Sequence, residues 1–440
     1  MTRVLVIGSG VAGLSAAVAL EKRKIAYDIL EATDWIGGRV KQATIGGRVV
    51  DIGAKFITGY QGNPITPYFV DTRLSQTDSG SYLVFDSDGQ EIKVGDLDLT
   101  TLLEDVSLRR QRAQRGDITV GTALALVAPM KQLAEPIREV LSYYCTDYEF
   151  SDTPDNTSLF QTHPLPSTTV FSNEFFFTNG SSNDLVKGLA DQIPKDRIKL
   201  NHPVRVLEQL EGTYRVQTAN GKDRNELVGY THVICTASLG VLQSGLIQFI
   251  PPLPREKTDD ILKFRMCSDV TMFIQFDKVW WPDTEFFLYA DKRRGYYPVW
   301  MNLSLEKYYG SHSCLLSCSV SGYEARRLER MSDEETTAEL LAVARKIFKE
   351  PRLKILDVCV PRWTSDPFFR GVYSNWPLGF SNEDFKVLKK PVHNLLFAGE
   401  HTSEHFNGYL QGAFLSGIEA VEAIVAQGEK TRYSRKTKPV

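Results

Sequence analysis

The start of the chain alternates short apolar runs with turn-forming residues in a pattern that predicts a βαβ unit. Residues 4–7 form an apolar run typical of a buried strand, residues 12 to about 24 have helical spacing, and residues 27–30 predict a second strand. The uncharged stretch from 4 to 20 also resembles a signal peptide or a short membrane span. Its three glycines fall where a strand would turn into a helix, which favours a nucleotide-binding unit.

The rest of the chain divides into a helical, a β-rich and a mixed stretch. Charged residues at helical spacing from 102 to 142, interrupted at 115–117, indicate a partly helical insertion. The predicted strands span 198–209, 214–218, 230–236, 270–276, 285–290 and 394–398, with a turn at Asn220-Gly221. The predicted helices span 333–349 and 412–426. This mixture predicts the α/β class.

Composition and charge exclude several classes of protein. The chain has 440 residues, 42% hydrophobic and 24% charged, which indicates a globular protein with a sizeable core. Its net charge of -3, without a long run of Lys and Arg, argues against nucleic-acid binding. The six cysteines lack zinc-like pairing, so we expect no metal. Residues 431–440 are basic without an apolar anchor, and we expect no membrane anchor and a cytoplasmic protein, or a secreted one if a signal peptide was removed.

The glycines between the first strand and helix carry a functional signal. Gly8-Ser9-Gly10-Val11-Ala12-Gly13 matches GxGxxG, and Glu31 ends the next strand. The first glycine would make the tight turn, the second would let a pyrophosphate approach the backbone, and the third would let helix and strand pack closely. The helix N-terminus would supply N–H donors, and Glu31 would accept hydrogen bonds from ribose hydroxyls. This segment predicts dinucleotide binding.

The residues after this unit resemble a family. The run Glu31-Ala32-Thr33-Asp34-Trp35-Ile36-Gly37-Gly38-Arg39-Val40, followed by Asp51-Ile52-Gly53-Ala54, resembles the FAD-dependent amine oxidases, as do residues 396–402 and 407–413. The resemblance implies that Arg39 lies on the FAD diphosphate and that Glu400 meets the ribityl chain or pyrophosphate. The cofactor-binding residues that it implies are Gly8, Ser9, Gly10, Ala12, Gly13, Glu31, Ala32, Gly38, Arg39, Gly53, Ala54, Lys55, Val204, Trp363, Trp376, Gly399, Glu400, Gly408 and Tyr409.

Several motifs are similar to plant-type polyamine oxidases in particular. They lie at 236–243, 286–290, 293–297, 373–377 and 399–405, and the resemblance weakens between about 71 and 142. It implies oxidation of the carbon next to a secondary amine of spermine, spermidine or their acetylated forms. The imine would hydrolyse to an aldehyde and an amine, and O2 would be reduced to H2O2.

The resemblance also implies which side chains face the substrate. Tyr373 and Tyr409 match the family's aromatic pair, which flanks the substrate amine and excludes water. Glu149 matches a carboxylate of the polyamine tunnel, where a low dielectric favours pairing with a protonated nitrogen. Phe56 and Thr58 complete the implied substrate-binding set.

The chain departs from the family at two positions. Thr58 stands where a second acid is common, so a cationic substrate would lose one attraction. Thr271 stands where a lysine holds a water near the flavin, and we include Thr271 in the catalytic set because its hydroxyl could hold that water. Asp269 falls on the same face of the strand and could supply a replacement acid. Lys55 is the alternative source of the missing positive charge.

These motifs predict two α/β domains. A Rossmann-like FAD-binding domain would comprise residues 1–75, 190–250 and 355–440, and a substrate domain of mixed sheet and helices residues 76–189 and 251–354. A flavin oxidase of a monoamine or an amino acid is one alternative, and a non-catalytic binding module on the same fold is another. The sequence leaves open which carbon beside the nitrogen is oxidised, and the oligomeric state.

Overall fold

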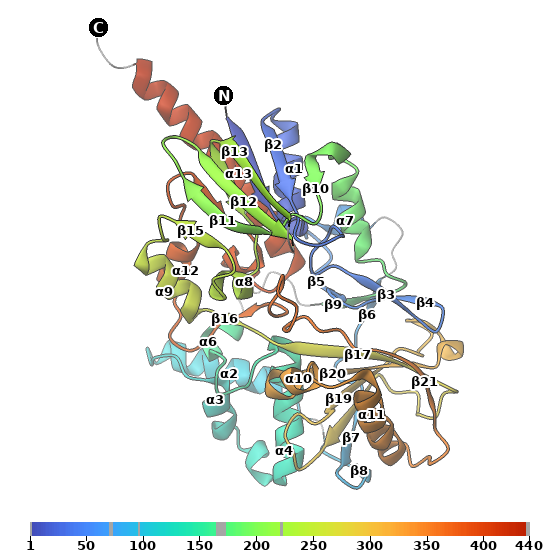
Figure 1. Ribbon diagram of the computed structural model, residues 1–440. Coiled ribbons are helices and arrows are strands. Elements are labelled where there is room, and N and C mark those ends of the chain that lie inside the picture. The colour runs from blue at the N-terminus through green and yellow to red at the C-terminus, as the bar shows by residue number, and fades with distance from the viewer. Residues whose placement is uncertain (1, 70–73, 96, 164–172, 221–222, 437–440) are drawn as a thin grey trace.

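The first strand lies at the centre of a parallel sheet whose members are far apart in the sequence. The computed structural model describes residues 2–69, 74–95, 97–163, 173–220 and 223–436. The sheet has the order β10-β2-β1-β14-β23. Its strands are β1 (Arg3–Ile7), β2 (Ala26–Leu30), β10 (Ile198–Lys199), β14 (His232–Cys235) and β23 (Leu395–Phe397). The βαβ unit is therefore confirmed, and later segments of the chain extend its sheet on both sides (Figure 1).

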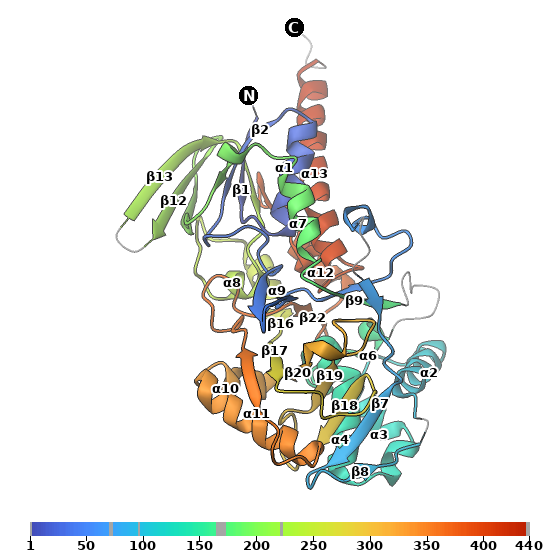
Figure 2. The same cartoon turned by 90° about the vertical axis from the view of Figure 1, so that its right-hand side faces the viewer.

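Three helices lie together beside this sheet. They are α1 (Val11–Lys22), α7 (Asn183–Ala190) and α13 (Leu410–Lys436), and Figure 2 shows them running alongside one another. The first and last helices pack so closely that only glycine fits at position 417. A Cβ there would lie 2.1 Å from the carbonyl oxygen of Ala12. The Ser15 hydroxyl also donates a hydrogen bond of 2.8 Å to the carbonyl of Phe414. These contacts join the two ends of the chain.

A four-stranded sheet packs on the other side of the parallel sheet. It comprises β11 (Val204–Gln209), β12 (Tyr214–Asn220), β13 (Asp223–Tyr230) and β15 (Gln248–Ile250). The single strand predicted over 198–209 is wrong, because Asn201 adopts a left-handed φ of 57° and separates β10 from β11. Strand β13 escaped prediction because its sequence is mostly polar, as suits a strand at the edge of a sheet.

The other half of the molecule is built on a seven-stranded sheet of order β21-β17-β20-β19-β18-β7-β8. Its strands are β7 (Tyr82–Asp86), β8 (Glu91–Ile92), β17 (Asp269–Phe276), β18 (Phe286–Ala290), β19 (Val299–Asn302), β20 (Leu315–Ser321) and β21 (Ile355–Cys359). Helices α10 (Gly322–Leu328) and α11 (Asp333–Ile347) share a hydrophobic core with this sheet. A second core joins it to α2 (Leu99–Arg112), α3 (Val120–Leu126) and α4 (Glu135–Ser142), which confirms the helical insertion.

Short elements connect the two halves. Two of these elements are two-stranded sheets, one of β3 (Gln42–Ile45) and β4 (Arg48–Asp51) and one of β16 (Arg265–Met266) and β22 (Ser374–Asn375). A third is a three-stranded sheet of order β5-β9-β6, with β5 (Phe56–Thr58), β9 (Glu174–Phe177) and β6 (Leu74–Gln76). The short helices are α5 (Tyr148–Phe150), α6 (Leu159–Thr162), α8 (Leu239–Gln243), α9 (Arg255–Lys263) and α12 (Asn382–Lys389). Helix α9 packs against α12.

The division into two domains at 75, 190, 250 and 355 stays a prediction, and two elements near its boundaries pack with the half of the molecule to which it does not assign them. Strand β21 begins at Ile355 yet pairs with β17 in the seven-stranded sheet. Helix α7 falls within the predicted substrate domain yet packs against α1, where Leu185 and Leu189 are fully buried. Sequence spacing does not show this because both elements pack with partners that are distant in the chain.

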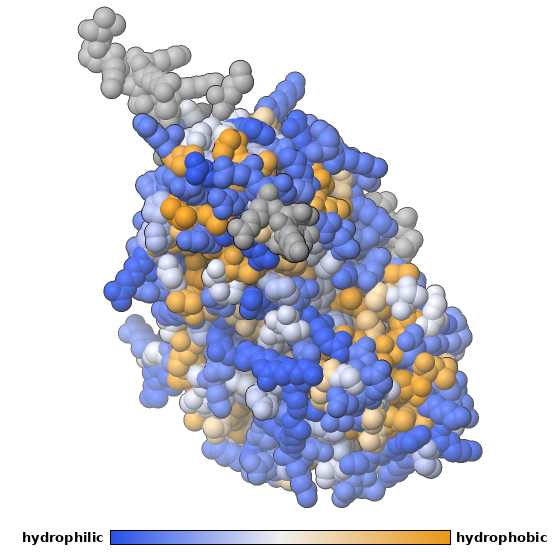
Figure 3. Space-filling view, viewed as in Figure 1, coloured by the Kyte–Doolittle hydropathy of each residue, from blue (hydrophilic) through white to orange (hydrophobic). Residues whose placement is uncertain are grey.

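Hydrophilic and hydrophobic residues are mixed on the surface of the molecule (Figure 3). Hydrophilic residues cover most of the face seen in Figure 3, with smaller groups of hydrophobic residues between them. Within the described ranges, no helix is both long and apolar enough to cross a membrane.

Candidate active site

One cavity of about 700 Å³ brings together the residues that the sequence singled out. It extends from the glycine turn after β1 to the residues of β5, β9 and β17, so both halves of the molecule contribute to its wall. All the predicted cofactor and substrate residues line it except Ser9 and Gly13. The structure thus gathers residues from both ends and the middle of the chain.

The glycine turn has the close packing that the GxGxxG pattern predicts. Gly8 has a φ of 100°, a conformation that side chains rarely adopt. A Cβ at Gly13 would lie 2.0 Å from the carbonyl oxygen of Gly8, so this residue serves helix–strand packing and does not reach the cavity. A Cβ at Gly38 would lie 3.1 Å from the Cα of Gly10, which brings the second glycine-rich segment directly onto the first.

Glu31 lies at the edge of the cavity in a closed set of hydrogen bonds. Its Oε2 accepts from the backbone N–H of Ser9 at 2.7 Å and from the Ser9 hydroxyl at 2.8 Å. Its Oε1 accepts from the N–H and the hydroxyl of Thr33, both at 2.9 Å. Ser9 therefore holds Glu31 in place rather than facing the cavity, and Thr33 is a supporting residue that the motif alone did not indicate.

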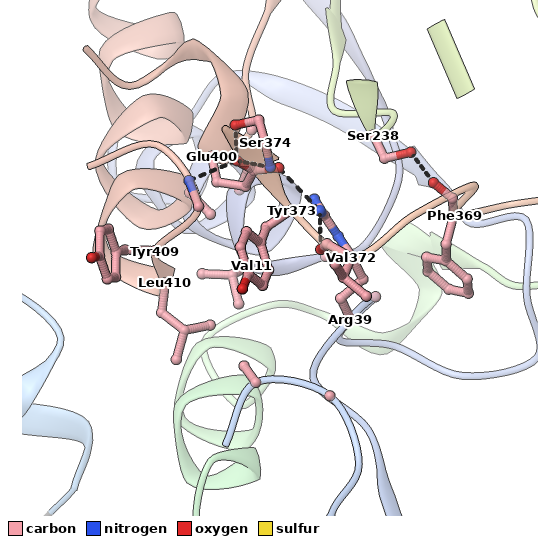
Figure 4. Close-up of a pocket in the computed structure, with 18 of the residues that line it drawn as sticks. Val11, Arg39, Ser238, Phe369, Val372, Tyr373, Ser374, Glu400, Tyr409 and Leu410 are labelled. Atoms are coloured by element: carbon pink, nitrogen blue, oxygen red, sulfur yellow. Dashed lines mark hydrogen bonds and ion pairs between the residues drawn. The ribbon is translucent and has the colours of Figure 1, made fainter. Parts of the chain in front are cut away.

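Glu400 is the centre of a second network, which Figure 4 shows. Its Oε1 lies 3.0 Å from Nη1 of Arg39, and its Oε2 accepts from the Ser374 hydroxyl at 2.6 Å and from the Gly408 N–H at 2.8 Å. Arg39 also donates to the carbonyl of Val372 at 2.7 Å. Burial opposes ionisation, but the Arg39 charge and these hydrogen bonds keep the pKa of Glu400 below its ordinary value.

The two predicted tryptophans are buried in the cavity wall with their indole N–H groups bonded to protein. Trp363 donates to the carbonyl of Ile52 at 3.1 Å, next to Gly53. Trp376 donates to the side chain of Asn407 at 2.6 Å. Both rings therefore have fixed orientations, as buried tryptophans with a bonded N–H usually do.

Tyr373 and Tyr409, both drawn in Figure 4, contribute aromatic rings to the cavity. The Tyr373 hydroxyl accepts from the Ser151 hydroxyl at 2.6 Å and donates to the backbone carbonyl of Glu149 at 3.1 Å. Burial raises the pKa of both tyrosines, so both are neutral. Sequence reasoning did not indicate Ser151, whose left-handed φ of 51° turns the chain after Glu149.

A π-helical turn leads into this segment. Residues Tyr143–Asp147 form that turn directly before α5, which carries Glu149. Such turns occur mostly as single insertions and are frequent at functional sites. Glu149 lines the cavity and is accessible there, and desolvation by the surrounding wall raises the pKa of its carboxyl.

Thr271 and Asp269 lie on the same face of β17, as strand alternation predicts. The Thr271 hydroxyl donates to Asp269 at 2.9 Å and lies 2.9 Å from the Ser319 hydroxyl. Burial raises the pKa of Asp269, while the charge of Lys55 opposes this rise. The Thr271 hydroxyl is thus already engaged by protein groups, and its role as a water holder stays a prediction.

Metal-binding geometry is not found in the described part of the chain. No three His, Cys, Asp or Glu side chains there gather in an arrangement that could hold a metal ion.

Comparison with known proteins agrees with this arrangement. Residues 11–425 match the family described as flavin containing amine oxidoreductase. The chain is 36% identical to polyamine oxidase 1 of Zea mays, with 97% of this chain and 91% of the relative covered. It is 37% identical to polyamine oxidase 6 and to polyamine oxidase 7 of Oryza sativa subsp. japonica, with 98% and 95% of this chain and 92% and 94% of those relatives covered. The chain therefore belongs to the flavin-containing amine oxidoreductase family and is an FAD-dependent oxidoreductase with an α/β fold.

Proposed function

We propose that this chain is a polyamine oxidase, which oxidises the carbon next to a secondary amine of spermine, spermidine or their acetylated forms. The observation that carries the proposal is that one cavity joins the dinucleotide turn to an acid without a protein partner. Glu149 forms no ion pair with a described residue, and it lies in the cavity wall beside Tyr373. An unpaired carboxylate in such a wall favours a cationic ligand.

The cradle for FAD fits the residues present. Two glycine segments meet at Gly10 and Gly38, the N-terminus of α1 faces the cavity, and Arg39 is held there by Glu400. These groups suit a diphosphate, which needs backbone N–H donors, close approach and a positive charge. When bound, FAD would accept a hydride from the substrate and pass the electrons on to O2.

The protein's own share of the reaction would be orientation and exclusion of water. The neutral rings of Tyr373 and Tyr409 would flank the amine that reacts, and Glu149 would hold a distal ammonium. The hydrogen bonds of Tyr373 to Ser151 and to the Glu149 backbone would fix the ring relative to the acid. Substrate length and ring position would then determine which carbon faces the flavin.

The alternative substrates find less support in the cavity. An amino-acid oxidase would bind the substrate carboxylate with an arginine, whose guanidinium matches it with two parallel hydrogen bonds. Arg39 is the one arginine among the described residues that line the cavity, and its guanidinium is bound to Glu400. A binding module without redox function would have no need for the aromatic pair together with the complete glycine turns.

Anaerobic mixing of the purified holoenzyme with amines tests this proposal. Spermine or spermidine, acetylated or not, should bleach the flavin absorbance far faster than benzylamine or leucine, and aerobic turnover should release H2O2. Mass analysis of the products would identify the bond that is cleaved. Faster reduction by benzylamine or leucine would contradict the proposal, and so would protein that neither contains nor takes up FAD.

A further inference from the structure

The sheet β5–β9 places an acid directly opposite Thr58. Thr58 and Glu174 are register partners in this antiparallel pair, and Phe56 is the partner of Phe176. Side chains of directly opposed residues lie on the same face of a sheet, and so do residues two apart in one strand. Thr58, Glu174 and Phe56 all line the cavity, so this shared face is the one that turns toward the substrate.

Glu174 belongs to the same electrostatic environment as Glu149. It is half-buried and forms no ion pair with any described residue. Burial, followed by the charge of Glu149, raises the pKa of Glu174 to about 8, and the charge of Lys55 opposes the rise. The charges of both acids also act on Tyr409. The cavity therefore contains two carboxyl groups that oppose each other's ionisation, and neither forms an ion pair with a described residue.

We propose that Glu174 supplies, from the opposing strand, the second ammonium-binding carboxylate that the chain lacks at Thr58. Glu149 and Glu174 would then bind one protonated nitrogen of the polyamine together. This inference rests on the proposed function, since it names the residue that selects the substrate's charge. Two mutually repelling acids gain from a cation between them because its charge removes the repulsion and offsets the cost of burying them.

Aromatic side chains around the two acids suit the same ligand. Tyr148 and Phe56 line the cavity, and the ring of Tyr148 stacks on that of Tyr144 with centroids 5.6 Å apart. A cation over an aromatic face is stabilised by the ring quadrupole, and the effect increases when water is excluded. The competing explanation is that Glu174 balances the charge of Lys55, whose Nζ lies 5.5 Å from the centre of the Phe56 ring.

Titration of the anaerobic holoenzyme with spermine separates these explanations. In a stopped-flow experiment, Glu174→Gln should raise the Kd for spermine by roughly tenfold or more, as for a lost charge-assisted hydrogen bond. The limiting rate of flavin reduction should change much less. Acetylation of one spermine terminus removes a charge. If the remaining cations of an acetylated form do not reach Glu174, Glu174→Gln should reduce the affinity for that form less than the affinity for spermine.

The double variant Thr58→Glu/Glu174→Gln provides the decisive control. It moves the carboxylate back across the strand pair and should recover most of the affinity for spermine. Glu211→Gln removes the same charge from an exposed turn between β11 and β12 and should leave the Kd unchanged. A Glu174→Gln protein that binds spermine as tightly as the wild type would overturn the inference, as would a double variant no better than the single one.

The outcome also distinguishes this inference from the proposed function. If the wild-type flavin is not reduced by any polyamine, the proposed function fails, whatever Glu174 does. If the wild type is reduced and Glu174→Gln behaves like Glu211→Gln, only the role of Glu174 fails. Should Glu174→Gln not fold, Glu174→Asp and the double variant still test the role, because both retain a carboxylate in this wall.

Discussion

The acids at the two ends of the cavity differ in whether protein groups pair with them. At the dinucleotide end, Glu31 and Glu400 have hydrogen bonds to both carboxylate oxygens, and Arg39 is paired with Glu400 at 3.0 Å. At the substrate end, Glu149 and Glu174 have no ion pair with a described residue. The acids of the first end are thus fixed by protein groups, whereas we expect those of the second end to be available to a ligand.

The largest expected effect comes from breaking the dinucleotide end. Arg39→Met would leave the buried Glu400 without its cation, which typically costs about 3–5 kcal/mol. We expect loss of FAD and a clearly lower Tm, measured by flavin absorbance per protein and by thermal unfolding. Arg109→Met, which removes an exposed pair with Asp105, should change neither. A yellow Arg39→Met protein of normal Tm would show that the network is dispensable.

Glu31→Ala should weaken the same end less. It removes the acceptor of the Ser9 and Thr33 hydrogen bonds and the expected ribose contact, which predicts a loss in FAD affinity of roughly 1–3 kcal/mol. The rate of flavin reduction should stay near the wild-type value once FAD is saturating, because Glu31 is remote from the expected substrate position. Fluorescence titration of the apoprotein with FAD measures the affinity, and an unchanged Kd would contradict the assignment.

Lys55 provides a way to sharpen the comparison at the substrate end. Lys55→Met should slow reoxidation of the reduced flavin by roughly tenfold, because a positive charge near the flavin stabilises developing superoxide. Thr271→Lys should raise the rate little, since Asp269 lies within hydrogen-bonding distance of the residue at 271 and would pair with the new ammonium. Stopped-flow mixing with O2 measures both rates.

Two outcomes of the reoxidation experiment would change the assignment of Lys55 as the positive charge near the flavin. A marked acceleration in Thr271→Lys would indicate that the charge is missing in the wild type. Unchanged reoxidation in both variants would show that neither position influences the reaction with O2. Amine oxidation in Lys55→Met, followed anaerobically, serves as the internal control.

The smallest expected effect is a pH dependence of a few-fold. Glu174 has a pKa raised to about 8, so it is largely protonated in the empty cavity at pH 6 and ionised above pH 8. Spermine should bind more tightly as pH rises across this interval, with protons released, and Glu174→Gln should flatten the slope. Calorimetry in two buffers of different ionisation enthalpy measures both.

The stability of the substrate-free protein should move in the opposite direction. A carboxyl whose pKa is raised by folding binds its proton more tightly in the folded than in the unfolded state. The stabilisation is present below the ordinary pKa of 4.5 and is lost as pH rises toward about 8. Two results together would argue that the two acids do not interact. The first is a spermine affinity that is independent of pH. The second is a wild-type Tm that, compared with the Tm of Glu174→Gln, does not fall as the pH rises over this range.

The predictability of the two ends also differs, for a physical reason. The glycine turn and Glu31 lie within one βαβ unit, so their spacing in the chain is set by local geometry. Glu174 could not be found this way, because it meets Thr58 only through the pairing of β9 with β5. Ser374, which donates a hydrogen bond to Glu400, could not be identified either, because no local sequence pattern links these two residues.

The fold class and several elements were predictable for a related reason. Apolar runs and helical spacing identified β1, α1, β17 and α11 to within a few residues. The break at Asn201 and the polar strand β13 were not predicted, because backbone conformation and edge pairing decide the structure there. The buried strands β19 (Val299–Asn302) and β20 (Leu315–Ser321) were not predicted either, so an apolar stretch alone did not identify every strand.

The discontinuous parallel sheet has a consequence for the order in which the protein can mature. Strand β1 and its glycine turn are synthesised long before β23, Glu400 and α13. Until that end is synthesised, the turn lacks the helix that packs on α1 and the carboxylate that holds Arg39. A nascent chain without these segments therefore cannot assemble the complete cofactor cradle, and we expect tight capture of FAD only after α13 has been synthesised.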